Sequence, residues 1–226
     1  IAAAGVDFQR AIDIFTNLLE AKPDNSRYLQ SRAALSNALA LAMRTQGKIK
    51  AEQAAYRIAE QDYARLIQSR PDDPSFRKNL ALTQNNRAQT LNRIGQSSEA
   101  VELVLPAYRI LDALYEQFVD VPEYGEQLGI CCEVLAHAHM LRDDRIQAKR
   151  FGSIAVEQFQ ELAELNPAIG KYRQRLAMAQ GRVAESLSRE KDYESALELV
   201  SLAIQSLKTL AIEFPKSGSY QASLAR

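Results

Sequence analysis

The stretch YRQRLAMAQGRVAES, residues 172–186, has the spacing of an amphipathic helix, and its outline recurs every 48 residues along the chain. The clearest marker of this interval is an aromatic residue. The aromatic residues that mark it are Tyr28, Phe76, Tyr124, Tyr172 and Tyr220. A fixed interval that runs from one end of the chain to the other predicts a repeat protein.

Two alanine positions repeat at the same interval and predict close packing of helix backbones. The first comprises Ala40, Ala88, Ala136 and Ala184, and the second comprises Ala11, Ala59, Ala107, Ala155 and Ala203. A larger side chain at such a position would overpack the contact by about 1–3 kcal/mol. Around these alanines the apolar residues follow helical spacing in each half of the unit, as in Leu176, Ala177, Val183, Ala184 and Leu187, then Ala196, Val200, Ala203, Leu207 and Leu210. Each unit is therefore predicted to be two helices.

The glycine, proline and capping residues between these segments predict ten helices and no strand. We expect them at residues 2–21, 26–45, 49–70, 74–94, 98–119, 123–141, 145–165, 168–189, 193–213 and 217–226. Gly47 and Gly95 separate the two halves of their units, and Asp73, Asn166 and Asp192 are predicted N-caps. The fold class predicted is an all-α, right-handed α-α superhelix. It forms one solenoid over residues 1–226, with a partial repeat 1–27, repeats 28–75, 76–123, 124–171 and 172–219, and a stub 220–226.

The composition argues against two classes of partner. The chain has 28 basic and 28 acidic side chains, so it has no net attraction for nucleic acid or anionic lipid. We expect no membrane-spanning segment, because charged residues interrupt every apolar run. The chain begins at Ile1 without a leader, which suggests a piece of a longer polypeptide.

The residues that most often carry chemistry do not form a recognisable site. Adjacent Cys131 and Cys132 fit a reducing compartment, so we expect a cytoplasmic protein. His137 and His139 point to nearly opposite sides of a helix, which argues against a metal pair. Without a phosphate loop, a nucleophile elbow or a ligand cluster, we expect no enzyme and no cofactor. The pair Glu133 and His137, four residues apart, is the best catalytic candidate, in which the carboxylate would raise the imidazole pKa. An exposed ion pair on one helix explains the spacing adequately, and we favour that explanation.

The repeat resembles the tetratricopeptide repeat. The first-helix signature of that family is matched at Gln180, Val183, Ala184 and Leu187, and the second-helix signature at Ala4, Phe8 and Ala11 and at Ala196, Val200 and Ala203. A family repeat has 34 residues, whereas this one has 48. The surplus of about 14 residues adds about four helical turns. The sequence pattern of the repeats is also similar to that of the tails that follow catalytic domains in some bacterial serine/threonine protein kinases.

The resemblance implies that one face of each first helix lines a concave groove that binds a protein or peptide segment. The side chains predicted to line this groove are Asn37, Arg44, Lys48, Lys78, Asn85, Gln89, Asn92, Glu133, His137 and Glu185. Asn37 and Asn85, one period apart, would each hold a peptide backbone unit. The groove positions are basic and amide-rich in the first two units and acidic in the third and fourth, so a bipolar site is expected. The alternative that these positions are ordinary solvated faces stays open.

Two functions are therefore predicted from the sequence. The first is a non-catalytic scaffold or binding module that takes a peptide or protein segment in the groove. The second is a structural arm of a larger multidomain signalling protein, such as a bacterial serine/threonine kinase, that self-associates through open solenoid ends. The incomplete repeats at residues 1–27 and 220–226 motivate the second function.

Overall fold

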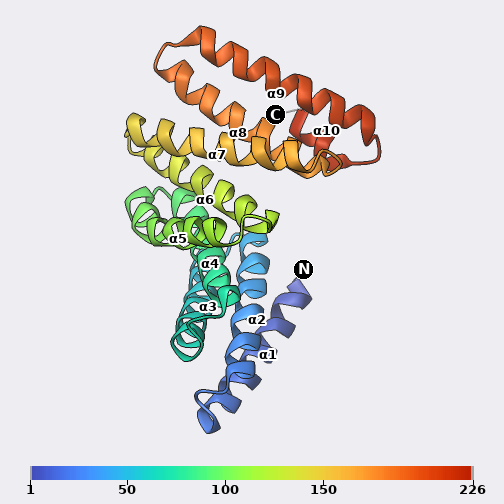
Figure 1. Ribbon diagram of the computed structural model, residues 1–226. Helices are drawn as coiled ribbons and strands as arrows, with labels where there is room; N and C mark the ends of the chain where they lie inside the picture. Colours follow the sequence, from blue (N-terminus) through green and yellow to red (C-terminus); the bar gives the residue numbers. More distant parts are fainter. Residues whose placement is uncertain (1, 225–226) are drawn as a thin grey trace. The chain divides into compact units, whose positions relative to one another are not determined.

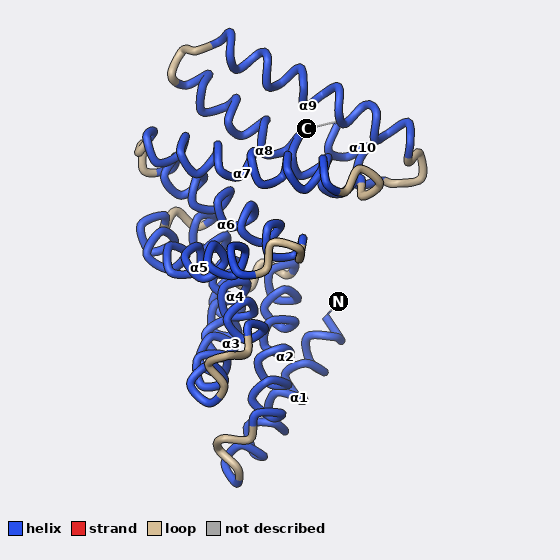
Figure 2. The backbone as a smooth tube through the Cα atoms, in the orientation of Figure 1, coloured by secondary structure: helices blue, strands red, loops and turns tan. Residues whose placement is uncertain are grey.

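A computed structural model describes the backbone of residues 2–224 and the side chains from Gly5 to Leu224. Within this part of the chain all regular structure is helical (Figure 1, Figure 2). The ten helices are α1 (Ala2–Ala21), α2 (Ser26–Thr45), α3 (Ile49–Ser69), α4 (Pro74–Arg93), α5 (Ser97–Gln117), α6 (Pro122–Leu141), α7 (Arg145–Leu165), α8 (Gly170–Arg189), α9 (Tyr193–Glu213) and α10 (Gly218–Leu224). The bounds expected from the sequence differ from these by no more than two residues.

The helices follow the 48-residue interval without drift. The first helices of successive 48-residue repeats begin at Ser26, Pro74, Pro122, Gly170 and Gly218. Helices α1 to α4 each pack on the next as antiparallel pairs, helices α6 to α9 do the same, and α10 packs on α9 and α8. The chain divides into two compact units, residues 1–110 and residues 111–226, and each is described separately. The expectation of one continuous solenoid over residues 1–226 stays a prediction.

The recurring small residues lie where helices meet. Ala40, Ala59 and Ala88 are completely buried in the first unit, and Ala155 and Ala184 are nearly so in the second. In the second unit, Ala177 packs with Ala203, Leu207 and Leu210, as the sequence predicts. Gly129 shows how close the contact is, because a Cβ atom built there would lie 2.8 Å from the ring of Phe159.

The turns between paired helices also follow the interval. Gly47 and Gly95 have φ of +69° and +78°, the left-handed conformation that favours glycine. The equivalent turns carry Asp143 and Lys191, at φ of +54° and +66°. A side chain with a Cβ atom is disfavoured in this conformation, so the later turns carry strain that the earlier ones avoid.

Two of the three predicted N-caps are confirmed. Asp73 accepts a hydrogen bond from the amide of Ser75, and Asp192 accepts one from Ser195. The prediction for Asn166 is wrong, because Asn166 ends α7 and its side chain donates to the carbonyl of Leu162. Helix α8 begins only at Gly170, so Pro167 lies in the connecting turn.

Candidate functional site

One predicted groove residue of the first unit, Arg44, binds a buried carboxylate that the sequence did not indicate. Glu52 on α3 is completely buried and accepts hydrogen bonds from Arg44 Nε at 2.8 Å, from Arg93 Nη2 at 2.9 Å and from the Thr90 hydroxyl. A buried charge is stable only when it is paired in this way. The cluster therefore fastens α2, α3 and α4 together.

Arg44 is saturated with partners rather than free to bind a ligand. Besides Glu52, its guanidinium donates to the Asn86 carbonyl at 2.6 Å and to Gln89 Oε1 at 3.4 Å. It also donates to the hydroxyl of Tyr56, whose pKa burial raises to about 12. The structure thus brings the predicted residues Arg44 and Gln89 together, in a contact between helices.

The asparagines predicted to hold a peptide lie between helices. Asn85 and Asn92 are 2% and 5% exposed, so the prediction that they line an open groove is wrong. Asn37 is half-buried and donates through Nδ2 to Thr83 Oγ1 at 2.9 Å, which uses the amide that a peptide carbonyl would need. Of the remaining predicted residues in this unit, Lys48 is exposed and Lys78 is half-buried.

In the second unit, the predicted residue Glu133 is also buried, at 4% exposure. Its carboxylate lies 3.6 Å from Arg182 Nε and 3.8 Å from Arg175 Nη1, and Oε1 has no hydrogen-bond partner. Burial outweighs these two cations and raises the pKa of Glu133 above its ordinary value. Glu133 therefore does not face an open groove, contrary to the prediction.

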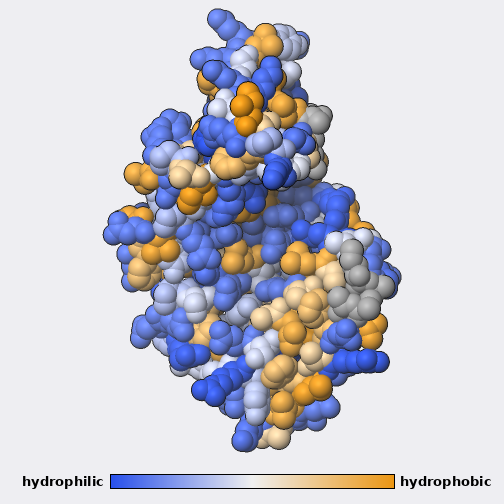
Figure 3. Space-filling model, turned by 90° about the vertical axis from the view of Figure 1, so that its right-hand side faces the viewer, coloured by the Kyte–Doolittle hydropathy of each residue, from blue (hydrophilic) through white to orange (hydrophobic). Residues whose placement is uncertain are grey.

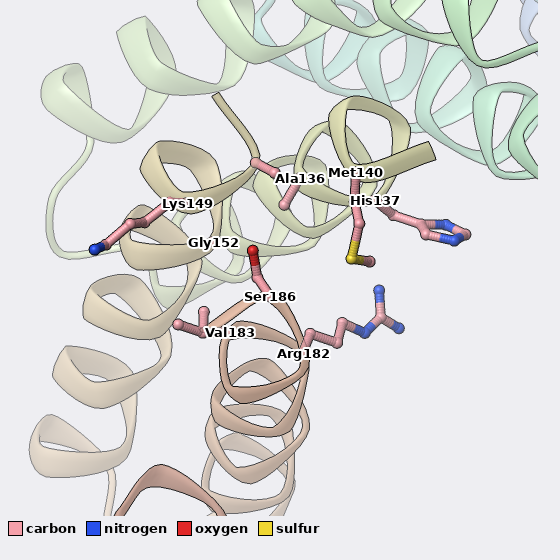
Figure 4. A pocket seen from close by; sticks show the side chains of 9 residues that line it. Ala136, His137, Met140, Lys149, Gly152, Arg182, Val183 and Ser186 are labelled. Carbon is pink, nitrogen blue, oxygen red and sulfur yellow. The ribbon is translucent and has the colours of Figure 1, made fainter. Parts of the chain in front are cut away.

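His137 lies beside a small enclosed cavity of about 20 Å³ between α6, α7 and α8 (Figure 4). Met140, Gly152 and Val183 also line this cavity, and the side chain of Lys149 points away from it. A space of this size holds one water molecule. The pKa of His137 is lowered, by burial first and then by Arg182, so the prediction that Glu133 raises it is wrong.

We expected the groove to be basic in the first half of the chain and acidic in the second, but in the structure cations lie beside three of the acidic side chains of the second half. Glu126 on α6 pairs with Lys171 at 2.7 Å, and Glu133 lies beside two arginines. Glu185 is exposed and pairs with Arg189 at 2.8 Å. Each of these three acids thus has a cation from α8 beside it, and these cations lie outside the positions counted in the sequence.

The cysteines and the second histidine are packed rather than poised for chemistry. Cys131 and Cys132 are fully buried thiols, and burial raises the pKa of both. His139 is buried, stacks on Phe151 and makes a 2.9 Å contact from Nδ1 to Asp144. Among the described residues, no three histidines, cysteines or carboxylates lie together as a metal site would require.

The structure shows an apolar face on α9 that the sequence analysis treated in part as core. Tyr193, Leu197, Val200 and Ile204 are 59%, 67%, 37% and 40% exposed. Their spacing of four, three and four residues places them on one side of α9. Two hollows of about 570 Å³ and 540 Å³ lie along this side, between α9 and α8. The prediction that Val200 is a core residue is wrong, and we name these four residues the α9 face.

The exposed apolar residues also make α9 the one helix among those described that is long and apolar enough to cross a membrane. Its mean hydropathy over 18 residues is 1.3, and 22% of that window is buried. The expectation that no segment reaches this apolarity is therefore wrong for Tyr193–Glu213. The helix combines a stripe packed on α8 with the α9 face, and the two together account for its hydropathy.

No family model and no curated protein matches the sequence, so the resemblance to kinase tails has no support. The structure is similar to that of BtubC (BKLC) from P. vanneervenii, with 13% identity, 92% of this chain and 91% of that chain covered, and a TM-score of 0.53. It aligns less well with MamA residues 41–end from Desulfovibrio magneticus RS-1, with 15% identity, 89% and 96% covered, and a TM-score of 0.38.

At 13% identity, the similarity to BtubC concerns the fold alone. It agrees with the helix order, the antiparallel pairing and the fixed interval described above. The chain is an all-α protein built from sequential antiparallel helix pairs, which is the architecture of tetratricopeptide-repeat solenoids.

Proposed function

We propose that this protein is a non-catalytic interaction module that binds a helical or extended segment of a partner protein. Stacked helix pairs expose long surfaces, and the polar side chains that could act in catalysis, such as Glu133 and His139, are buried between helices. Both features suit binding better than catalysis. The observation that carries the proposal is the α9 face, where two hollows of more than 500 Å³ lie beside four exposed apolar side chains.

The polar residues predicted from the sequence support a structural role instead. Arg44, Glu133 and the amide of Asn37 serve contacts between helices, so a partner would have to break those contacts to use them. Asn85 is buried and out of a partner's reach. An exposed apolar side chain costs nothing to make available. We therefore propose that binding uses the apolar surface and that the protein works in the cytoplasm, where buried thiols such as Cys131 and Cys132 stay reduced.

Selection of a displayed random-peptide library against the immobilised full chain tests the proposal. We expect enrichment of peptides that bind with micromolar affinity and are displaced by the free chain. Bare beads and beads that carry the urea-unfolded chain are the controls. If no sequence is enriched beyond these controls, the chain is not a peptide-binding module of this kind.

A second candidate function is self-association. Helix α1 exposes Val6, Ile14 and Leu18, at 52%, 59% and 38%. Hydrophobic groups run along the lower part of the face in Figure 3, at the height where Figure 1 places α1. Sedimentation velocity over a hundredfold range of concentration distinguishes this function, because association through α1 must weaken when Ile14 is changed to Glu.

A further inference from the structure

Helix α8 carries four cations in one row. We name the residues Lys171, Arg175, Arg182 and Arg189 the α8 row. At about 100° per residue, these positions lie within about 40° of one another around the helix. Their side chains are 51%, 34%, 45% and 58% exposed, so all four reach solvent.

The α8 row borders α6 rather than the end of the helix stack. Lys171 of the row pairs with Glu126 of α6 at 2.7 Å. Helix α10 meets α8 on another side, where Gln174 donates hydrogen bonds to the Ser219 carbonyl and the Ser223 hydroxyl. A helix pair stacked beyond α10 would therefore lie on that side and would not cover the row.

Helix packing does not explain the two arginines at the centre of the row. The other three first helices, α2, α4 and α6, have the same length as α8 and follow the same interval. At the position of Arg175 they carry Ser31, Asn79 and Gln127, and at the position of Arg182 they carry Ala38, Asn86 and Val134. Uncharged side chains thus serve the fold at both positions, and the two arginines are specific to α8.

The two arginines also exceed what their acidic neighbour needs. Glu133 is 4% exposed, and its carboxylate lies 3.8 Å from Arg175 Nη1 and 3.6 Å from Arg182 Nε, beyond hydrogen-bond reach. In the part of the chain that the structure describes, neither guanidinium donates a hydrogen bond to another residue. One carboxylate between two guanidiniums leaves one positive charge and several N–H donors, which a ligand can use without breaking an existing bond.

The surroundings of Arg182 suit an anion with a single charge. Figure 4 shows the ring of His137 and the guanidinium of Arg182 pointing to the same side, with the sulfur of Met140 between them. Burial, and then the cation of Arg182, lowers the pKa of His137, so the ring is neutral at pH 7 and adds no charge. A carboxylate balances the remaining cation, whereas a phosphate group of about two charges would leave excess negative charge beside Glu133.

We propose that the α8 row is the docking site for an acidic segment of a partner protein, with one carboxylate of the segment bound between Arg175 and Arg182. Lys171 and Arg189, each paired with an acid of this chain, attract further carboxylates at longer range. The row extends over about 27 Å of helix, which equals about eight residues of an extended segment. The proposal rests on the interaction function proposed above and adds a charged contact that does not depend on the α9 face.

Octaglutamate labelled with fluorescein matches the length of the row and serves as the probe, because its charges keep it extended. Fluorescence anisotropy against the full chain in about 50 mM salt is the measurement. Since the chain has no net charge, binding needs a local excess of cations. We expect binding that is about tenfold weaker for Arg182→Gln, which removes one charge-assisted pair. Arg150→Gln on α7 removes the same charge from an exposed side chain outside the row and should change nothing.

A change at Glu133 separates docking from a purely structural role of the arginines. Glu133→Gln removes the carboxylate that competes with the probe, so octaglutamate should bind at least about threefold more tightly. The double variant Glu133→Gln with Arg182→Gln leaves no buried acid without its cation, so misfolding cannot account for lost binding there. Its affinity should fall about tenfold below that of Glu133→Gln, with unchanged circular dichroism.

Three results would overturn the proposal. They are failure of octaglutamate to bind, equal binding to the wild type and to Arg182→Gln, and equal weakening by Arg150→Gln. If library-selected peptides still bind in any of these cases, the interaction function stands and only the acidic docking site fails. Concentration-dependent dimerisation that Arg182→Gln abolishes would make a second copy of the chain the occupant instead of a partner.

Discussion

Replacing Arg44 with Glu separates a structural from a ligand-binding role for the predicted groove. Arg44 is bonded to completely buried Glu52 and is itself only 23% exposed. Removal of one partner from a buried ion pair costs about 3–5 kcal/mol. Arg93 and Thr90 still contact Glu52 in the variant, so we take about 2–3 kcal/mol for the lost pair.

The new carboxylate adds repulsion. Two like charges about 4 Å apart at an effective dielectric constant of about 20 repel by about 4 kcal/mol. The sum, about 6 kcal/mol, is comparable to the entire stability of a small domain, about 5–15 kcal/mol. Arg44→Glu should therefore unfold the helices α2 to α4. Arg44→Met, which keeps the aliphatic stem, should cost about 2 kcal/mol.

Urea unfolding of the full chain, followed by circular dichroism at 222 nm, measures these changes. Arg27→Glu is the matched control, because Arg27 lies on the same helix and is exposed; we expect a change below about 0.5 kcal/mol. If Arg44→Glu unfolds at the same urea concentration as the wild type, Arg44 does not fasten the helices. Arg44 would then again be a candidate for binding a ligand in the groove.

Three further variants test the packing, the turns and the histidine. Gly129→Ala should destabilise the second unit by about 1–3 kcal/mol in urea unfolding, because its Cβ atom would meet the ring of Phe159; an unchanged midpoint would contradict the contact. Lys191→Gly should stabilise the chain by about 0.5–1 kcal/mol by relieving a positive φ, and Gly95→Lys should destabilise it by a similar amount; equal melting temperatures would argue against strain. Because the pKa of His137 is lowered, the stability from its neutral form is fully present above about pH 6.5 and is lost as pH falls through the folded pKa. His137→Gln should therefore lose less unfolding free energy than the wild type between pH 6.5 and 5, and parallel pH profiles would contradict the lowered pKa.

The helices could be predicted from the sequence because their signals are local and repeated. Gly47, Gly95 and Asp73 fix turns and helix starts through backbone conformation and capping alone, and the interval transfers each assignment to the next unit. The N-cap prediction for Asn166 fails because a side-chain amide can end one helix as readily as it begins another. Only the position of Gly170 decides between the two.

The candidate site could not be predicted in the same way, because it depends on which residues from other helices face each position. A helical projection places Arg44 and Asn85 on the side away from the apolar stripe, but Glu52 and the neighbouring helices cover that side. The α9 face had a sequence signal, since Tyr193 and Leu197 replace Arg145 and Lys149 at one interval. That signal gains meaning only once the structure shows both side chains to be more than half exposed.

The most direct test of the account is photo-crosslinking from the α9 face. A benzophenone amino acid placed at Leu197 in the full chain should crosslink to a peptide selected from the displayed library, and the unlabelled peptide should suppress the product. The same group at Ile146, equally accessible on α7, should give no product. A crosslink from Ile146 alone, or from neither position while the peptide binds, would show that partners dock elsewhere.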